Sequence, residues 1–127
     1  MTKGNYVDGF VLVIPKKNVA KYKKMAAEGA KIWKRFGALD YKECMGNDLN
    51  PDMGGVRGLT FAKMTKAKPS ETVWFSYIVF KDKKHRDAVN KKVMAYFSKK
   101  YADKKHQDMP FDMKRMAYGG FKTVVQL

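Results

Sequence analysis

The segment from Thr72 to Phe80 constrains the fold of this chain more than any other. It reads Thr-Val-Trp-Phe-Ser-Tyr-Ile-Val-Phe, a run of β-branched and aromatic residues that predicts a strand. A strand with one face in water alternates apolar and polar residues, because successive side chains point to opposite faces of the sheet. This run is apolar at nearly every position, so both of its faces must be covered. Helices of the same chain can cover one face, and the other needs a second sheet, most simply from an identical subunit, or a large ligand. We therefore expect a homodimer packed sheet to sheet.

Three further strands are expected. The first covers Tyr6–Ile14 and is ended by Pro15, which cannot donate to a β-ladder. The second covers residues 38–45, where Leu39 and Tyr41 alternate with charged residues, and the last covers residues 115–125 with an interruption at Gly119 and Gly120.

Two basic amphipathic helices are expected between the strands. The first follows Asn18 as its N-cap and ends at Gly37, and its apolar row has helical spacing: Val19, Tyr22, Ala26, Gly29, Trp33 and Phe36. The second is capped by Asp82 and continues toward Lys105, with Ala88, Val89, Val93 and Phe97 as its buried row. Residues 46–70 are rich in turn formers and are predicted to be one long loop, a lid or an arm toward a partner, although residues 56–64 are apolar enough to hide a short element.

The predicted order of elements is β-α-β-loop-β-α-β. This order is typical of the α+β class with a ferredoxin-like βαββαβ antiparallel sheet and both helices on one face. A length of 127 residues suits one domain, which we expect to span residues 1–127.

The chain is strongly basic, with a formal net charge of +15, and most of the excess lies in residues 16–35 and 81–106. Both segments are the predicted helices, so the positive charge should lie on the outer helical face, represented by Lys21, Lys24, Lys31 and Lys34. A solvated surface explains this face most simply, while salt-sensitive attachment to nucleic acid or another acidic partner stays open. Sequence-specific recognition of single strands is disfavoured, because neither Gly9-Phe10 nor Gly120-Phe121 lies in the RNA-recognition signature.

The sequence lacks the motifs of several common classes of enzyme. There is no phosphate-binding glycine loop, no dinucleotide glycine pattern and no GxSxG, and no cofactor is predicted. Asp48, Asn50 and Asp52 begin like a calcium loop, but Met53 and Leu59 stand where glycine and a carboxylate are required, so no metal site is predicted.

The lone cysteine and the hydropathy bear on location. Cys44 cannot form an intramolecular disulfide and has no activating histidine beside it, so we expect a packed thiol in a reducing cytoplasm. No run approaches the length of a membrane span, and the N-terminus does not resemble a signal peptide.

Candidate site residues follow from polar groups on strands and at helix ends. Side chains that could act as acids, bases or anion holders are Asp8, Tyr41, Glu43, His85, Asp112 and Arg115. Residues that could shape a ligand niche are Gly9, Trp74, Tyr118, Gly119 and Gly120, although the glycines serve equally to place a bulge or allow close packing. An ion pair with Arg115 is an equally ordinary fate for Asp8 or Asp112.

The chain resembles the bacterial DUF1428 family of unknown function over nearly its whole length. The residues that carry the resemblance are 6–10, 15–18, 37–44, 85–90, 92–94, 109–112 and 115–121. The resemblance implies a dimeric α/β-barrel built from ferredoxin-like subunits, and it implies no activity or catalytic residue.

Two hypotheses of function remain from the sequence. The favoured one is a small-molecule binder or cofactor-free enzyme of the dimeric α/β-barrel type, with its pocket between sheet and helices and the long loop as a lid. The alternative is a non-catalytic interaction protein whose basic helical face binds nucleic acid or another acidic partner. The sequence alone does not decide the function.

Overall fold

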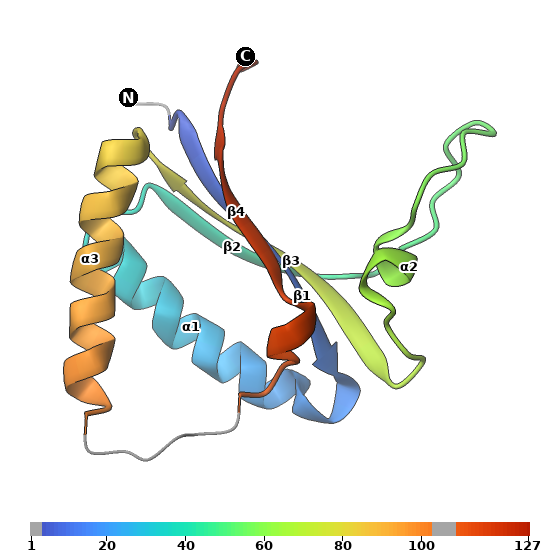
Figure 1. Ribbon diagram of the computed structural model, residues 1–127, viewed down its shortest axis with the longest axis horizontal. Coiled ribbons are helices and arrows are strands. Elements are labelled where there is room, and N and C mark those ends of the chain that lie inside the picture. Colours follow the sequence, from blue (N-terminus) through green and yellow to red (C-terminus); the bar gives the residue numbers. More distant parts are fainter. Residues whose placement is uncertain (1–3, 103–108) are drawn as a thin grey trace.

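The computed structural model describes residues 4–102 and 109–127, and within them the chain forms an α+β fold around one antiparallel sheet (Figure 1). The strands are β1 (Tyr6–Pro15), β2 (Asp40–Met45), β3 (Glu71–Phe80) and β4 (Ala117–Lys122). The helices are α1 (Val19–Arg35), α2 (Phe61–Thr65) and α3 (Lys83–Lys100), with 3₁₀ turns at Lys16–Asn18 and Met113–Arg115. The strand order is β2-β3-β1-β4, so the sheet is open and β2 and β4 form its edges.

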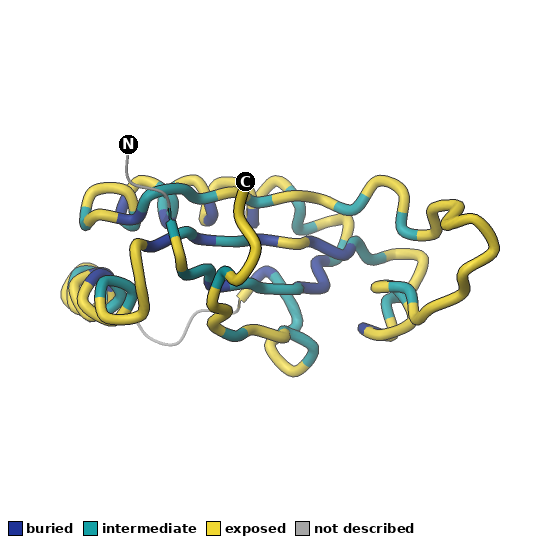
Figure 2. Tube along the Cα trace, turned by 90° about the horizontal axis from the view of Figure 1, so that it is seen from above, coloured by how far each residue is buried: buried dark blue, intermediate teal, exposed yellow. Residues whose placement is uncertain are grey.

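The two long helices lie on the same face of the sheet, as the sequence predicts (Figure 1). Ile32 of α1 and Val93 of α3 share one core cluster with Phe80 of β3, and all three are almost fully buried. A second cluster joins Tyr22 of α1 to Trp74 of β3. Figure 2 shows the buried residues concentrated along the central strands and the inner side of α1.

The pairing of β1 with β3 assigns the side chains to the two faces. Pairs run from Tyr6 with Phe80 to Pro15 with Glu71, and the even-numbered residues of both strands face the helices. Thr72 and Ser76 are the polar residues of β3 on this inner face, and Ser76 is buried between Trp74 and Ile78 along the strand.

The predicted helix ends are partly correct. Asp82 caps α3, since its side chain accepts a hydrogen bond from the backbone N–H of His85. Asn18 stands before α1, but its side chain makes no capping bond and its Nδ2 donates instead to the Pro110 carbonyl. Gly37 has a φ of +116°, a conformation that glycine adopts without strain. In the predicted buried row of α3, Ala88 is exposed, and the continuation toward Lys105 lies outside the described residues.

Residues 46–70 form an arm that carries α2 and projects from the side of the sheet opposite α1 and α3 (Figure 1). The prediction of one uninterrupted loop is therefore wrong at residues 61–65. Thr60 caps α2 through a bond from the Lys63 N–H, and the helix ends at Lys66 in the left-handed region with φ 56°. The rest of the arm is exposed almost throughout (Figure 2).

The outer face of the sheet is only partly covered within the chain. Val13 and Val73 are paired and buried on this face, next to the segment that carries α2. Farther along, Phe75 is 47% exposed and Phe121 is 62% exposed. Among the described helices, none is long and apolar enough to cross a membrane.

Candidate functional site

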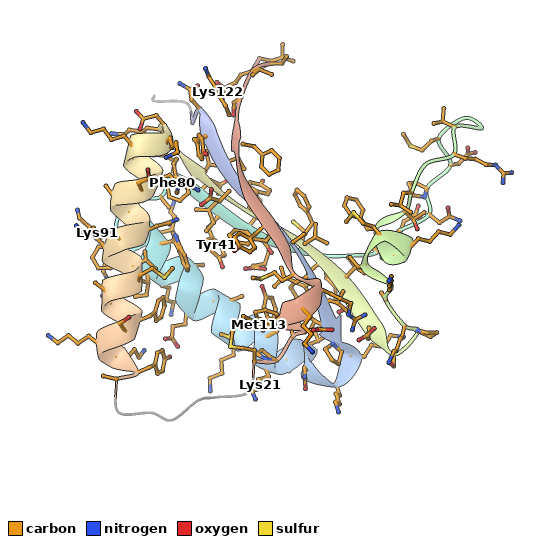
Figure 3. All side chains as sticks on the ribbon, viewed as in Figure 1. Lys21, Tyr41, Phe80, Lys91, Met113 and Lys122 are labelled. Atoms are coloured by element: carbon orange, nitrogen blue, oxygen red, sulfur yellow. The ribbon has the colours of Figure 1, made fainter. Side chains whose placement is uncertain are left out.

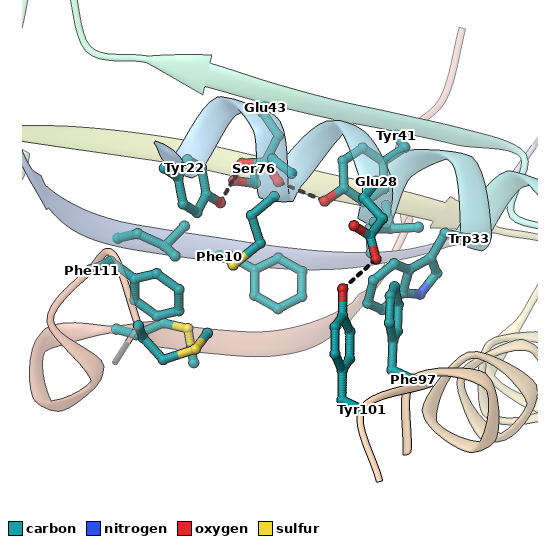
Figure 4. A pocket seen from close by; sticks show the side chains of 17 residues that line it. Phe10, Tyr22, Glu28, Trp33, Tyr41, Glu43, Ser76, Phe97, Tyr101 and Phe111 are labelled. Carbon is teal, nitrogen blue, oxygen red and sulfur yellow. Dashed lines mark hydrogen bonds between the residues drawn. The ribbon is translucent and has the colours of Figure 1, made fainter. Parts of the chain in front are cut away.

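A cavity of about 560 Å³ lies between the inner face of the sheet and the two long helices (Figure 4). Strands β1, β2 and β3, the two long helices and the segment before β4 contribute to its wall, whereas no residue from 46–70 lines it. The strands supply Phe10, Leu12, Tyr41, Glu43, Ser76 and Ile78. Helix α1 supplies Tyr22, Met25, Ala26, Glu28, Gly29 and Trp33, and the rest of the wall is Phe97, Tyr101, Met109, Phe111 and Met116. The predicted pocket between sheet and helices is present, but the arm is not its lid within this chain.

Strand periodicity positions the polar groups of the cavity. In β2, Tyr41 and Glu43 are two residues apart and pair with Ile78 and Ser76, so all four lie on the inner face. Tyr22 reaches the same point from α1, where its ring packs edge-on against Trp74 at 5.0 Å between centroids.

Glu43 is the centre of a cluster of three hydroxyls (Figure 4). Its Oε1 accepts hydrogen bonds from Tyr22 Oη at 2.7 Å and from Ser76 Oγ at 2.5 Å. Its Oε2 accepts one from Tyr41 Oη at 2.7 Å. Among the described residues no basic side chain forms an ion pair with Glu43, so this half-buried carboxylate is balanced by hydrogen bonds rather than by a cation.

The environment of the cluster keeps both tyrosines protonated. Burial raises the pKa of Tyr22 and of Tyr41 well above the ordinary value, and the negative charge and hydrogen bond of Glu43 raise both further. Each hydroxyl therefore remains a hydrogen-bond donor to Glu43 well into the alkaline range.

A second polar group lies at the α3 side of the cavity. Glu28 Oε1 accepts a hydrogen bond from Tyr101 Oη at 2.7 Å and forms an ion pair with Lys100 Nζ at 3.0 Å. The Tyr101 ring stacks on Phe97 at 6.1 Å. Nearby, Trp33 Nε1 donates to Asn90 Oδ1 at 2.9 Å, which fixes the indole in the wall.

Of the side chains predicted as acids, bases or anion holders, the structure brings only Tyr41 and Glu43 to the cavity. Asp8 is buried on the inner face but pairs with Arg86 at 2.6 Å, with Asn90 Nδ2 at 3.4 Å as a second partner. The ion pair considered for Asp8 thus exists with Arg86 and not with Arg115. His85 lies where β3 turns into α3, and its Nδ1 accepts a hydrogen bond from the Lys81 N–H.

Asp112 and Arg115 form a separate surface cluster with Glu71. Arg115 contacts Glu71 at 2.6 Å and Asp112 at 2.7 Å. The hydrogen bonds from Arg115 lower the pKa of both carboxyl groups below their usual range. None of the three lines the cavity. Their ion pairs join the start of β3 to the turn before β4.

The predicted niche residues are dispersed. Gly9 and Gly119 pair across β1 and β4, and the Phe121 ring covers both on the outer face. A Cβ at Gly120 would overlap the ring of Tyr6, so this glycine makes room for packing. Tyr118 is 73% exposed. Trp74 lines a shallower hollow of about 510 Å³ between β2 and α1, which shares Tyr41 and Glu43 with the cavity.

The charged helical face and the lone cysteine lie away from the cavity. Lys21, Lys24, Lys31 and Lys34 are exposed on α1, and Figure 3 shows Lys21 and Lys91 on the outer sides of their helices. Cys44 is exposed on the outer face of β2, so the prediction of a packed thiol does not hold within this chain. Asp48 and Asp52 accept bonds from the backbone two residues ahead, as in ordinary Asx turns. In the described residues no group of three acidic, histidine or cysteine side chains is arranged to hold a metal ion.

The prediction missed Tyr22 and Ser76 as site residues. Tyr22 stands in the apolar row of a helix, where its hydroxyl is indistinguishable from that of any packed tyrosine. Ser76 did carry a signal, because it stands between the apolar Trp74 and Ile78 on the inner face of β3, opposite the charged Glu43 of β2. Polar residues at inward-facing positions of two neighbouring strands predict a buried polar cluster.

Comparison with known proteins gives a family and uncharacterised relatives. A family model described as "Protein of unknown function (DUF1428)" matches residues 5–113. The "Uncharacterized protein YbaA" of Escherichia coli (strain K12) is 42% identical over 120 residues, covering 94% of this chain and 97% of that protein. The protein of the same description from Shigella flexneri has the same identity and coverage. Among solved structures, a de novo designed protein, Foldit4, is similar with a TM-score of 0.42 and 11% identity, covering 98% of this chain and 100% of the designed chain.

Proposed function

The chain belongs to the DUF1428 family, and we propose from the geometry of the cavity that this protein binds a small, largely apolar molecule and holds its polar group against Glu43. The observation that carries the proposal is the convergence of Tyr22, Tyr41 and Ser76 on one carboxylate in a cavity with otherwise mostly aromatic and aliphatic walls. Cavities of a few hundred Å³ with apolar walls and a few convergent polar groups are typical of small-molecule sites.

The geometry supports binding better than base catalysis. Tyr22, Tyr41 and Ser76 already donate hydrogen bonds to three lone-pair positions of the Glu43 carboxylate, which leaves few positions at which it could take a proton from a bound molecule. Catalysis without a cofactor at this site would require Glu43 to take a proton from the bound molecule. The same bonds fix the orientation of the carboxylate, which favours selective recognition.

A pair of variants with the same change of charge tests the proposal. Glu43→Gln removes the charge in the cavity and keeps the side-chain shape, and Asp48→Asn removes one from the arm while an amide oxygen can keep the Asx turn. A screen of small aromatic molecules by thermal shift should yield compounds that raise the unfolding midpoint of the wild type and of Asp48→Asn. The same compounds should have little effect on Glu43→Gln. Equal shifts in all three proteins would contradict the proposal.

We also propose that a second copy of the chain covers the outer face of the sheet, giving a dimeric α/β-barrel of ferredoxin-like subunits. The support is the apolar character of that face, where Phe75 and Phe121 are exposed next to the half-buried Val7, Tyr77 and Val79. Phe61 of α2 extends the same surface, with its ring 6.5 Å from that of Phe75. Such a pairing would also cover Cys44. We propose the cytoplasm as the location of the protein, because a lone thiol with no disulfide partner in its own chain suits a reducing compartment.

A further inference from the structure

The cavity has a polarity opposite to that of the protein that contains it. The chain carries a formal net charge of +15, yet the described residues that line the cavity include two glutamates and no lysine, arginine or histidine. Glu28 has Lys100 as an ion-pair partner, whereas Glu43 has hydroxyl partners. The local charge at the centre of the cavity is therefore negative.

The polar side chains of the described wall offer a ligand hydrogen-bond acceptors rather than donors. A hydroxyl has one proton to donate, and Tyr22, Tyr41 and Ser76 each donate theirs to Glu43. The indole N–H of Trp33 is donated to Asn90. What the three hydroxyls and Glu43 offer a ligand is lone pairs, including the second acceptor position of Glu43 Oε2, which among the described residues accepts a hydrogen bond from Tyr41 only. A ligand must bring the donors itself.

The aromatic walls favour the same kind of ligand. Trp33 and Tyr41 are 6.0 Å apart between ring centroids and tilted by 40°, and Tyr22 meets Phe111 edge-on at 5.9 Å. Aromatic faces attract cations, and the attraction increases where water is excluded. The negative charge, the open acceptor positions and the aromatic rings of the described wall together suit an ammonium group.

We infer that the cavity selects an organic amine in its protonated form, with the ammonium against Glu43 and an aromatic or aliphatic body along the rings. This inference rests on the proposed function and names the class of its ligand. An anion of the same shape is excluded, because it would meet a carboxylate and unshared lone pairs in a partly desolvated site.

Three probes of similar shape and different charge test the inference: 2-phenylethylamine, 2-phenylethanol and phenylacetate. We expect the amine to bind the wild-type chain about tenfold more tightly than the alcohol, because it adds charge and donors, and we expect phenylacetate not to enter the cavity. Binding is measured by titration calorimetry, and occupancy of the cavity by the methyl signals of Met25 and Met116, which line it. Surface attraction by the net positive charge would produce the reverse order, with phenylacetate first.

Glu43→Gln should reduce the affinity for the amine to that for the alcohol and change the alcohol less than twofold, whereas Asp48→Asn should preserve the wild-type order. If Glu43→Gln does not fold, the order of the three probes on the wild type decides the matter alone. Cavity binding of the alcohol or phenylacetate in preference to the amine would overturn the inference and leave the proposed function standing. Failure of all three probes to move the cavity methyl signals at millimolar concentration would overturn both.

Discussion

Glu43 and its two tyrosines make the stability of the protein sensitive to alkaline pH. Tyrosine in an unfolded chain titrates near pH 10. Burial and the charge of Glu43 raise the folded-state pKa of Tyr22 and Tyr41 above that value, so the folded state holds protons that the unfolded state releases. By linkage, their contribution is fully present below about pH 10 and is lost as the pH rises toward the folded-state pKa.

We therefore expect the free energy of unfolding of the wild type to fall above pH 10 by roughly 1.4 kcal/mol per pH unit for each tyrosine. The variant carrying both Tyr22→Phe and Tyr41→Phe should show a shallower decline. Urea unfolding between pH 8 and pH 11 measures the two slopes. Parallel slopes would show that these hydroxyls are not held in the folded state as described.

At Asp8 the expected effect is on stability and not on the site. Asp8 is 5% exposed and pairs with Arg86, which retains Asp87 as a second partner when Asp8 is neutralised. Asp8→Asn should therefore lower the free energy of unfolding by roughly 2 kcal/mol, less than the loss of a pair with no other partner. Chemical denaturation gives the value, and ligand titration checks that cavity binding is unchanged. A loss of binding without a loss of stability would return Asp8 to the candidate site residues.

At the scale of elements, local signals in the sequence predicted most of the fold. The apolar run before Phe80, the helical row from Tyr22 to Trp33 and the cap at Asp82 each depend on neighbours in the chain, and all three are confirmed. Helix α2 was obscured by the turn-forming residues around it. The predicted cap at Asn18 is wrong, because its side-chain amide donates to the Pro110 carbonyl 92 positions away, a contact that no local pattern reveals.

The candidate site was harder to predict than the fold for the same reason. Glu43 and Tyr41 are local in β2 and could be singled out. Their partner Tyr22 comes from α1 and Ser76 from β3, and the distance between them is set by tertiary packing. Sequence spacing indicates which face a residue occupies, but not which hydroxyl meets which carboxylate across the cavity.

The cap of α3 gives a prediction at this scale. Asp82 accepts a hydrogen bond from the His85 N–H at 2.7 Å, and the helix that it begins supplies Phe97 to the wall of the cavity. Asp82→Ala should cost about 1 kcal/mol of stability, whereas Asp82→Ser, which keeps a capping oxygen, should cost less. Thermal unfolding of both variants measures the difference. Equal losses would mean that the charge of Asp82, and not its hydrogen bond, stabilises α3.

At the scale of the whole molecule, the proposed dimer can be tested with two substitutions of comparable exposure. Phe75 is 47% exposed on the outer face of the sheet, and Met94 is 53% exposed on α3. Phe75→Glu should convert the dimer to a monomer, because it places a charge in an apolar interface, while Met94→Glu should leave the dimer intact. Native mass spectrometry gives the masses. A wild-type monomer, or a dimer that persists in Phe75→Glu and dissociates in Met94→Glu, would contradict the assignment of the interface.

The central claim is that the cavity beside Glu43 is where this protein binds its ligand, and methionine methyl NMR tests it most directly. Among the nine methionines, Met25, Met109 and Met116 line the cavity, while Met53 lies on the arm and Met94 on α3. Titration of the labelled wild type with a compound selected by thermal shift should move the signals of the three cavity methionines and leave Met53 and Met94 unchanged. Shifts confined to Met53 and Met94, with the cavity methionines silent, would place binding on the surface and contradict the account.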